Sequence, residues 1–320
     1  MRYRRFGSSD LEVSVVTFGS MRFVKGKSAD ADERTGKRAL AAALDGGVTT
    51  IHSSYEYGTR WALTDILRDH PKRHELHHVI KVTVPDFSDA GFDAAKFRGQ
   101  VEDALRDLHA ERIAVVQHLQ RGVSNDIIYG EEGDGPRIAA MPQVNQALLE
   151  VFQQLRQEGK VGWLATFPYT PGFAAAAIGT GAFHGMVAYF NLLETEMVPL
   201  LDTMRERGIG YFTMRPFMQG LISDKRAGDV RLPPGDSARR RAWEAYYPRY
   251  ARLQEELDAE VGSWSELAIR FALADPVMCS VILSMNTPEQ VAQVLAAADA
   301  ADLDPGFVRR VATINGHLAA

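Results

Sequence analysis

Short β-rich runs alternate with amphipathic helical stretches along almost the whole chain, and this alternation limits the fold more than any other feature. Between the third and fourth runs, for example, Val101, Leu105 and Leu108 recur at helical spacing. The β-rich runs are 13–18, 48–53, 79–84, 113–118, 161–166, 185–190, 210–214 and 280–283. Strands that alternate with helices build a parallel sheet, and eight such units predict an α/β fold of the (β/α)8 TIM-barrel type.

Turn residues and connection lengths add detail to this barrel. Gly47 and Gly159 follow helical patterns, where a left-handed residue commonly ends a helix. The opening segment 2–13 contains a Gly-Ser-Ser turn and predicts a small hairpin that closes the bottom of the barrel. Long loops are expected at 120–142, after the fourth strand, and at 217–264, after the seventh. Loops that follow barrel strands lie at the catalytic face, so both are expected to shape a pocket.

Composition and charge exclude several classes of protein. The 320 residues are 46% hydrophobic with a formal net charge of -5, and their basic residues are too dispersed to track a phosphate backbone. The single cysteine, Cys279, rules out a disulfide framework within the chain and a cysteine-ligated cluster. No apolar run approaches membrane-spanning length, and the N-terminus lacks an apolar signal core. We therefore expect one cytoplasmic domain, 1–320, that binds a small molecule rather than nucleic acid or membrane; the oligomeric state stays open.

Polar residues stand at or just beyond the C-terminal ends of the predicted strands. In a barrel these ends converge on one pocket, so side chains far apart in sequence meet there. The candidates are His52, Tyr57, Lys81, His118, Asn191 and Arg215. Lys81 lies in an apolar strand, where an unpaired ammonium group is costly to bury, and this favours a functional role. No metal is expected, because two imidazoles beside a lysine lack the third ligand and the anionic balance of a zinc site.

Motifs along the chain resemble those of the aldo/keto reductase family. The stretch IHSSYEYG (51–58) is similar to the family's second-strand motif, VIKV (79–82) to its strand-three lysine motif, and VVQHLQ (115–120) to its fourth strand. The stretches MRPFMQGLISDK (214–225) and VILSMNTPEQV (281–291) resemble the loops after its last two strands. These motifs occur in the family's order over nearly the whole chain. The resemblance implies a single-domain barrel that reduces a carbonyl with NADPH.

The resemblance also implies roles for the polar residues. Tyr57 matches the family's proton donor, Lys81 the ammonium group that stabilises the developing tyrosinate, and His118 the histidine that orients the carbonyl oxygen. A tyrosine needs such help because its resting pKa is about 10. The family's aspartate, which keeps the lysine charged, is His52 here. A neutral imidazole cannot supply that anion, so Lys81 is expected to lose part of its preference for the charged form.

A cofactor-binding set follows from the same resemblance, with NADP(H) as the implied cofactor. Its members are Gly220, Leu221, Ser284, Asn286 and Gln290. The chain departs from the family nearby: Phe167-Pro168 replaces the Ser-Asn pair that holds the nicotinamide, and Val187 replaces a glutamine. Phe190 remains as a stacking face. The alternative is that no nucleotide binds.

Cations for a 2′-phosphate are also missing from their usual place. No Lys or Arg occurs between Arg270 and Arg309, although a phosphate with roughly two negative charges needs a cation nearby. Lys225, Arg226 and Arg231, on the long loop after the seventh strand, are the expected substitutes.

Substrate contacts are expected from Phe23, Phe167, Asn191, Arg215 and Phe217. The aromatic side chains favour an apolar or aromatic substrate body. The Arg215 guanidinium is suited to clamping a carboxylate in bidentate fashion. The alternative for Arg215 is a salt bridge to a loop carboxylate such as Glu194 or Glu196.

Two functions fit these residues. The first is an NAD(P)H-dependent oxidoreductase with a degenerate catalytic tetrad of Tyr57, Lys81, His118 and His52. The second is a redox-neutral dehydratase, isomerase, lyase or cyclase in which His52 and His118 act as acid and base, since histidine titrates near neutral pH. A non-catalytic regulatory homologue is a third reading, because fold does not fix function. The first is favoured, since the resemblance covers nearly the whole chain.

Overall fold

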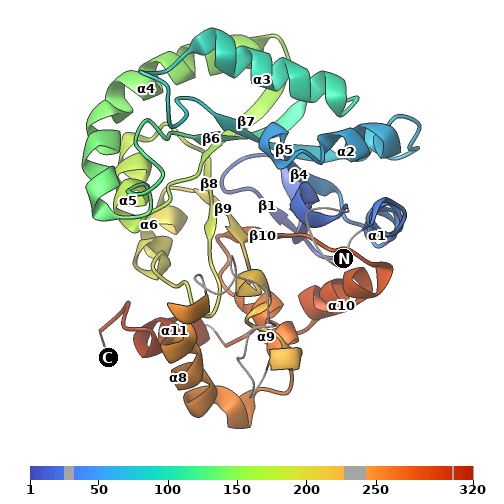
Figure 1. Ribbon diagram of the computed structural model, residues 1–320, viewed down its shortest axis with the longest axis vertical. Helices are drawn as coiled ribbons and strands as arrows, with labels where there is room; N and C mark the ends of the chain where they lie inside the picture. Colours follow the sequence, from blue (N-terminus) through green and yellow to red (C-terminus); the bar gives the residue numbers. More distant parts are fainter. Residues whose placement is uncertain (25–31, 227–242, 305, 320) are drawn as a thin grey trace.

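The chain folds into a closed barrel of eight parallel strands with helices around its outside (Figure 1). The computed structural model describes residues 1–24, 32–226, 243–304 and 306–319. The barrel strands are β3 (Val16–Gly19), β4 (Thr50–Ser54), β5 (His77–Thr83), β6 (Ile113–Leu119), β7 (Val161–Thr166), β8 (Gly185–Tyr189), β9 (Gly210–Met214) and β10 (Met278–Leu283). Each strand pairs with its sequence neighbour, and β10 pairs with β3 to close the ring. The predicted (β/α)8 barrel is confirmed.

Helices follow the strands and pack against them. Their bounds are α1 (Glu33–Asp45), α2 (Arg60–Leu67), α3 (Ala94–Asp107), α4 (Glu131–Gln157), α5 (Pro171–Thr180), α6 (Leu201–Glu206), α8 (Tyr247–Leu257), α9 (Trp264–Phe271), α10 (Pro288–Asp299) and α11 (Phe307–Ile314). Helices α1, α3, α5, α9 and α10 each begin after an Asp, Ser or Thr whose side chain accepts a backbone N–H bond from the first turn. These caps satisfy orphan donors and fix where each helix starts.

The segment after β6 differs from the expectation of a loop through 142. Helix α4 begins at Glu131, so the second half of this segment is helical despite Pro136 and Pro142 inside it. Acidic residues in the first turn suit the positive end of the helix dipole. Met141 and Val144 are buried, and Met141 packs in the hydrophobic core. This packing outweighs the local cost of the two prolines within the helix.

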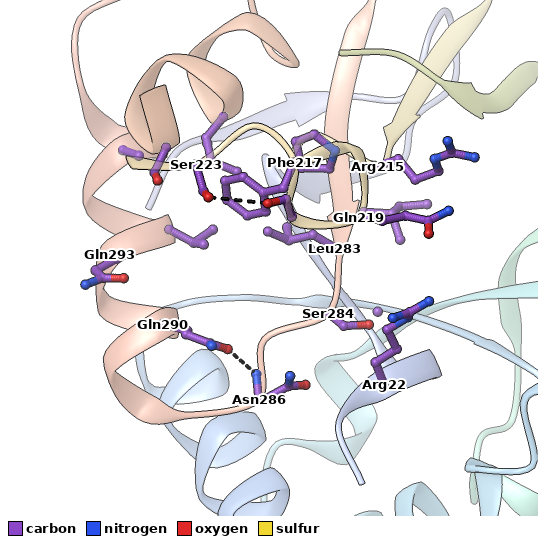
Figure 2. Close-up of a pocket in the computed structure, with 18 of the residues that line it drawn as sticks. Arg22, Arg215, Phe217, Gln219, Ser223, Leu283, Ser284, Asn286, Gln290 and Gln293 are labelled. Atoms are coloured by element: carbon purple, nitrogen blue, oxygen red, sulfur yellow. Dashed lines mark hydrogen bonds between the residues drawn. The ribbon is translucent and has the colours of Figure 1, made fainter. Parts of the chain in front are cut away.

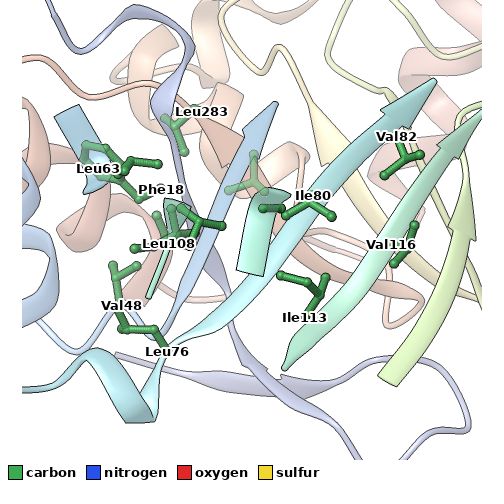
Figure 3. Close-up of a cluster of buried hydrophobic side chains, with 14 of the residues drawn as sticks. Phe18, Val48, Leu63, Leu76, Ile80, Val82, Leu108, Ile113, Val116 and Leu283 are labelled. Atoms are coloured by element: carbon green, nitrogen blue, oxygen red, sulfur yellow. The ribbon is translucent and has the colours of Figure 1, made fainter. Parts of the chain in front are cut away.

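Side chains along each barrel strand alternate between the interior and the surrounding helices. Ile80 and Val82 of β5 and Val116 of β6 belong to the outer core, which Figure 3 shows between the strands and the helices. Val79 and Val115, the alternate residues, belong to the cluster that fills the barrel interior. The alternation follows from the two-residue period of a strand.

The bottom of the barrel is closed by the predicted hairpin. Strands β1 (Tyr3–Arg5) and β2 (Glu12–Ser14) pair antiparallel. Phe6, between them, is fully buried in the interior cluster, with its ring centroid 5.3 Å from that of Phe212. A Cβ on Gly185 would lie 2.1 Å from the Phe6 ring, so this strand position has to be glycine.

Replacing Phe6 by alanine is expected to lower the free energy of unfolding by about 3–5 kcal/mol, because a cavity opens in a closely packed interior. Urea unfolding of Phe6→Ala measures this loss. Trp61→Ala, which removes an aromatic side chain that is 49% exposed on α2, is the control and is expected to cost less than about 1 kcal/mol. Equal losses in the two variants would contradict the role of Phe6 in filling the barrel interior.

Candidate active site

A pocket of about 740 Å³ opens at the C-terminal ends of β3, β4, β9 and β10. Its walls combine the turn after β9, the loop after β10 and residues of α9 and α10. Figure 2 shows Gln290 and Gln293 projecting from α10 on one side, with Arg215 and Gln219 on the opposite side. This is the face where barrel chemistry is expected.

The structure brings most of the expected cofactor-binding residues to this pocket. Gly220, Ser284, Asn286 and Gln290 all line it. The Asn286 backbone N–H donates to Gln290 Oε1 over 2.7 Å, which fixes the loop against the start of α10 (Figure 2). Leu221 does not line the pocket: its side chain is fully buried in the second hydrophobic core, because the turn after β9 directs it away from the pocket. The Leu221 side chain is therefore not part of the pocket lining, and a role for Leu221 in cofactor binding stays a prediction.

The expected phosphate-binding cations are only partly described. Lys225 is exposed on the short helix 224–226, while Arg231 lies outside the described residues. Arg22 and Arg215 do line the pocket. Sequence reasoning missed Arg22, which comes from the short helix after β3.

Tyr57 lines the inner end of the pocket. It ends the short helix η2 (Tyr55–Tyr57), directly after β4. Ser54 accepts a backbone N–H bond from Glu56, and Gly58 turns the chain with a φ of 62°, so the turn holds Tyr57 in place. Burial raises the pKa of the half-buried Tyr57 hydroxyl above its usual range. The Lys81 Nζ lies 5.6 Å from the centroid of the Tyr57 ring.

Lys81 has a carboxylate partner, contrary to the expectation that its anion was lost. Its ammonium group donates to Glu56 Oε2, and both side chains are largely buried. Burial lowers the pKa of Lys81, and the Glu56 carboxylate opposes that shift. Burial alone would raise the pKa of Glu56, but Lys81 and Arg121 outweigh it, and the pKa lies below its ordinary value. The pair therefore favours the charged form of both groups.

Arg121 extends this ion pair into a network of loops. Its guanidinium donates to Glu56 Oε1 over 2.9 Å and to Asp86 Oδ1 over 2.8 Å. Its Nε donates to the Tyr169 hydroxyl over 3.0 Å. The network thus joins the loops after β4, β5, β6 and β7, with two cations balanced by two carboxylates. Sequence reasoning missed Glu56 and Arg121; the acidic residue directly before Tyr57 was the available signal.

His52 lies in the barrel interior at the edge of the pocket. Its Nε2 is 2.6 Å from Gln117 Oε1 and donates to it, since an amide oxygen only accepts. Burial, assisted by Lys81, lowers the pKa of His52 to about 4 despite the bond to Gln117. The imidazole is therefore neutral near pH 7. It neither repels Lys81 nor supplies the anion that Lys81 needs.

His118 is not part of the site, which corrects the expectation of a catalytic histidine. It is the outward-facing residue of β6, and its ring lies 6.1 to 6.4 Å from those of Phe92, Phe97 and Phe183. Its Nε2 donates to the Val84 carbonyl oxygen over 2.6 Å. The inward residue is its neighbour Gln117, because side chains alternate along the strand. Burial lowers the pKa of His118 to about 4.

Three expected substrate contacts are packed into the protein instead. Phe23 is fully buried against Phe18, with ring centroids 5.6 Å apart. Phe167 lies in the interior cluster. Asn191 is fully buried and donates to Glu194 and to the Arg215 carbonyl oxygen, so its role is to shape the backbone. None of the three is among the residues that line the pocket.

Phe190 also does not lie in the pocket, contrary to the expectation that its ring offers a stacking face for the nicotinamide. Its fully buried ring stacks on Phe271 of α9, with 5.1 Å between centroids and 3° between planes. It belongs to the core outside the barrel, because it follows the interior-facing end of β8 by one residue. Phe217, by contrast, lines the pocket as expected.

Arg215 lines the pocket and is also paired within the protein. Its Nη2 lies 3.2 Å from Glu194 Oε1, and its guanidinium stacks 4.2 Å from the centroid of the Tyr189 ring. The salt bridge that sequence reasoning held open as an alternative is therefore present. Arg215 has a φ of 61°, which commits its backbone to a sharp turn after β9.

Fold and site define a (β/α)8 barrel with a tyrosine and an ion-paired lysine at its C-terminal face. The family model described as the aldo/keto reductase family matches residues 15–315. The chain belongs to this family, which places it among the oxidoreductases.

Individual relatives match over nearly the full chain. The uncharacterized oxidoreductase YrpG of Bacillus subtilis (strain 168) is 25% identical over 328 residues, which cover 93% of this chain and 91% of that protein. The holo form of aldo-keto reductase AKR11C1 from Bacillus halodurans has a TM-score of 0.74 at 20% identity, over 98% of this chain and 96% of that one. Glycerol dehydrogenase AKR11B4 from Gluconobacter oxydans has a TM-score of 0.70 at 19% identity, over 98% and 94%.

Among the residues that the structure describes, no helix has both the length and the apolar character needed to cross a membrane. In the same part of the chain, no three His, Cys, Asp or Glu side chains gather as a metal ion would require.

Replacing His118 by phenylalanine tests its placement outside the site. We expect carbonyl reduction within threefold of wild type, because the ring packs among aromatic side chains and is not among the residues that line the pocket. A histidine whose pKa falls from 6.5 to about 4 on folding destabilises the protein as pH drops through that window. Between pH 6.5 and 4, the free energy of unfolding should therefore fall less steeply with decreasing pH in the variant than in wild type, by up to about 1.4 kcal/mol per pH unit. Urea unfolding over this pH range measures the difference. A hundredfold loss of activity would return His118 to the site.

Replacing Arg215 by leucine tests whether its side chain serves the salt bridge to Glu194 or the binding of a substrate. The change leaves the buried Glu194 carboxylate unpaired, so we expect a loss of about 3–5 kcal/mol in urea unfolding. The double variant Arg215→Leu/Glu194→Gln should recover much of that loss. An increase in substrate KM with unchanged stability would instead support a substrate clamp.

Proposed function

We propose that the protein reduces the carbonyl group of a small molecule with a nicotinamide nucleotide. The observation that carries this proposal is the position of Tyr57, which stands beside the Lys81–Glu56 pair at the inner end of the pocket. A tyrosine next to a charged lysine is suited to donating a proton to an oxygen on which negative charge develops. Membership of the aldo/keto reductase family supports the same reaction class.

The pocket fits a nucleotide in size and in the chemistry of its lining. Its volume lies in the usual range for cofactor sites, roughly 300–1,000 Å³. Ser284, Asn286 and Gln290 offer hydrogen-bonding groups, and Arg22 adds a cation where the loop after β10 has none. The cofactor, when bound, would supply the hydride. The choice between NADPH and NADH belongs to the experiment, because Arg22 lines the pocket whereas Lys225 is not among its lining residues.

The protein's own groups account for the proton. Tyr57 donates its hydroxyl proton to the carbonyl oxygen as that oxygen gains negative charge. Lys81 then stabilises the tyrosinate electrostatically, since its ammonium group stays charged through Glu56. His52 remains neutral and hydrogen-bonded to Gln117. A half-buried tyrosine with a raised pKa is a poor acid alone, so the neighbouring cation is required.

The redox-neutral alternative loses the acid–base pair on which it depended. It needed His52 and His118 together, titrating near neutral pH. His118 faces the outer helices, and burial lowers the pKa of both imidazoles to about 4. The cytoplasmic location and the small-molecule substrate expected from the sequence stay predictions.

The proposal is tested by titrating the purified protein with NADPH and NADH while following nicotinamide fluorescence, and then by screening aldehydes and ketones. Micromolar binding with nucleotide-dependent turnover is the expected result. Absence of binding up to millimolar nucleotide would overturn the proposal.

Replacing Tyr57 by phenylalanine is expected to lower kcat by about 10²–10⁴-fold, because the proton donor is removed while the ring remains. Nucleotide affinity should change by less than threefold. The matched control is Tyr55→Phe, since Tyr55 belongs to the same turn but is 41% exposed. Comparable losses in the two variants would show that the turn, rather than the Tyr57 hydroxyl, matters.

A further inference from the structure

We propose that Glu56 is a positioning residue that keeps Lys81 charged beside Tyr57, and that it has taken over this task from the strand position now occupied by His52. The inference rests on the proposed function, in which Tyr57 donates a proton. It concerns a residue that the family motif does not point to, because the carboxylate now comes from the turn rather than from β4.

Contacts around Glu56 show a carboxylate fixed from several sides. Oε2 accepts from Lys81 Nζ and from Arg121 Nη2, the latter over 3.3 Å. Oε1 accepts from the Thr83 hydroxyl over 3.0 Å and from Arg121 Nη1 over 2.9 Å. Lys81 and Thr83 are two residues apart on β5, so both reach the same side of the strand. A carboxylate held by four donors is a pre-organised partner for the lysine rather than a mobile surface group.

The turn also couples the carboxylate to the proton donor. Glu56 and Tyr57 are consecutive residues of η2, so the backbone that orients the ring also orients the carboxylate. The side chains of Glu56 and Lys81 are only 20% and 14% exposed, which limits screening by water. The Lys81 ammonium group contacts Glu56 and lies 5.6 Å from the Tyr57 ring centroid. Displacement of the carboxylate would therefore alter both the charge and the position of the ammonium group.

Other groups near Lys81 do not supply the same interaction. His52, on β4, is neutral and bonded to Gln117. Asp86 is bonded to Arg121, whose positive charge opposes that of Lys81. Tyr57 and Tyr169 present hydroxyl groups whose pKa burial raises, so they are neutral at physiological pH. Among the described residues, Glu56 is the carboxylate in direct contact with Lys81.

The test compares Glu56→Gln with a variant that moves the carboxylate back to the strand, His52→Asp/Glu56→Gln. Glu56→Gln is expected to lower kcat at pH 7 by about 10–100-fold with nucleotide affinity unchanged. The fall of kcat at high pH should begin at lower pH, because loss of the anion lowers the pKa of Lys81. The double variant should recover at least fivefold of the lost rate. Glu111→Gln, an exposed substitution before β6, is the control and should match wild type.

A second readout does not require turnover. Acetylation of Lys81 at a series of pH values, followed by mass spectrometry, reports its pKa directly. The pKa is expected to fall by at least one unit in Glu56→Gln and to return within half a unit of wild type in the double variant. If wild type reduces no carbonyl but Lys81 shows these shifts, the proposed function fails while the Glu56 assignment stands.

One result would overturn the role of Glu56, and another would overturn the inference that this role was taken over from position 52. One is a Glu56→Gln protein, folded by circular dichroism, whose Lys81 pKa and pH profile equal those of wild type. The other result comes from the charge-conserving double variant, which also provides the comparison if Glu56→Gln does not fold. A Lys81 pKa lowered by a unit or more in that variant, despite Asp at position 52, would show that the task was not transferred from this position to Glu56.

Discussion

The alternation of side chains along parallel strands is the constraint on which the rest of this structure depends. A closed barrel has an interior and an exterior, and successive residues of a strand face one or the other. On β5 this directs Lys81 inward and Ile80 outward. On β6 it directs Gln117 inward and His118 outward. A shift of one residue therefore decides whether a histidine can belong to the site.

Electrostatics then organises the residues that face inward. A buried lysine requires a nearby anion, and the barrel provides it from the turn after β4 rather than from the strand itself. Arg121 binds the same carboxylate and a second one, Asp86. The result is a charge-balanced network at the C-terminal ends of neighbouring strands, where several loops meet. Such networks fix geometry because each member would be costly to bury alone.

The pocket is built from residues of several loops and helices around the C-terminal face of the barrel. Its lining is rich in amide and hydroxyl groups, with arginines contributed by the turns after β3 and β9. The fully buried ring of Phe190 stacks against α9 instead of entering the pocket. Functional positions on this barrel are thus distributed over several loops, and individual contacts can be replaced from a different loop without altering the strands.

The sequence by itself determined the barrel, the hairpin at its base and the placement of Tyr57, Ser284 and Asn286 around one pocket, because strand and helix periodicity and motif order are local properties of the chain. It did not determine that Glu56 pairs with Lys81 or that His118 faces the helices. Pairing depends on which loops meet above neighbouring strands, and facing depends on strand register to a single residue. Only the tertiary structure decides these two features. Glu56 and Lys81 are 25 residues apart in the sequence, and whole helices separate His118 from its aromatic neighbours along the chain.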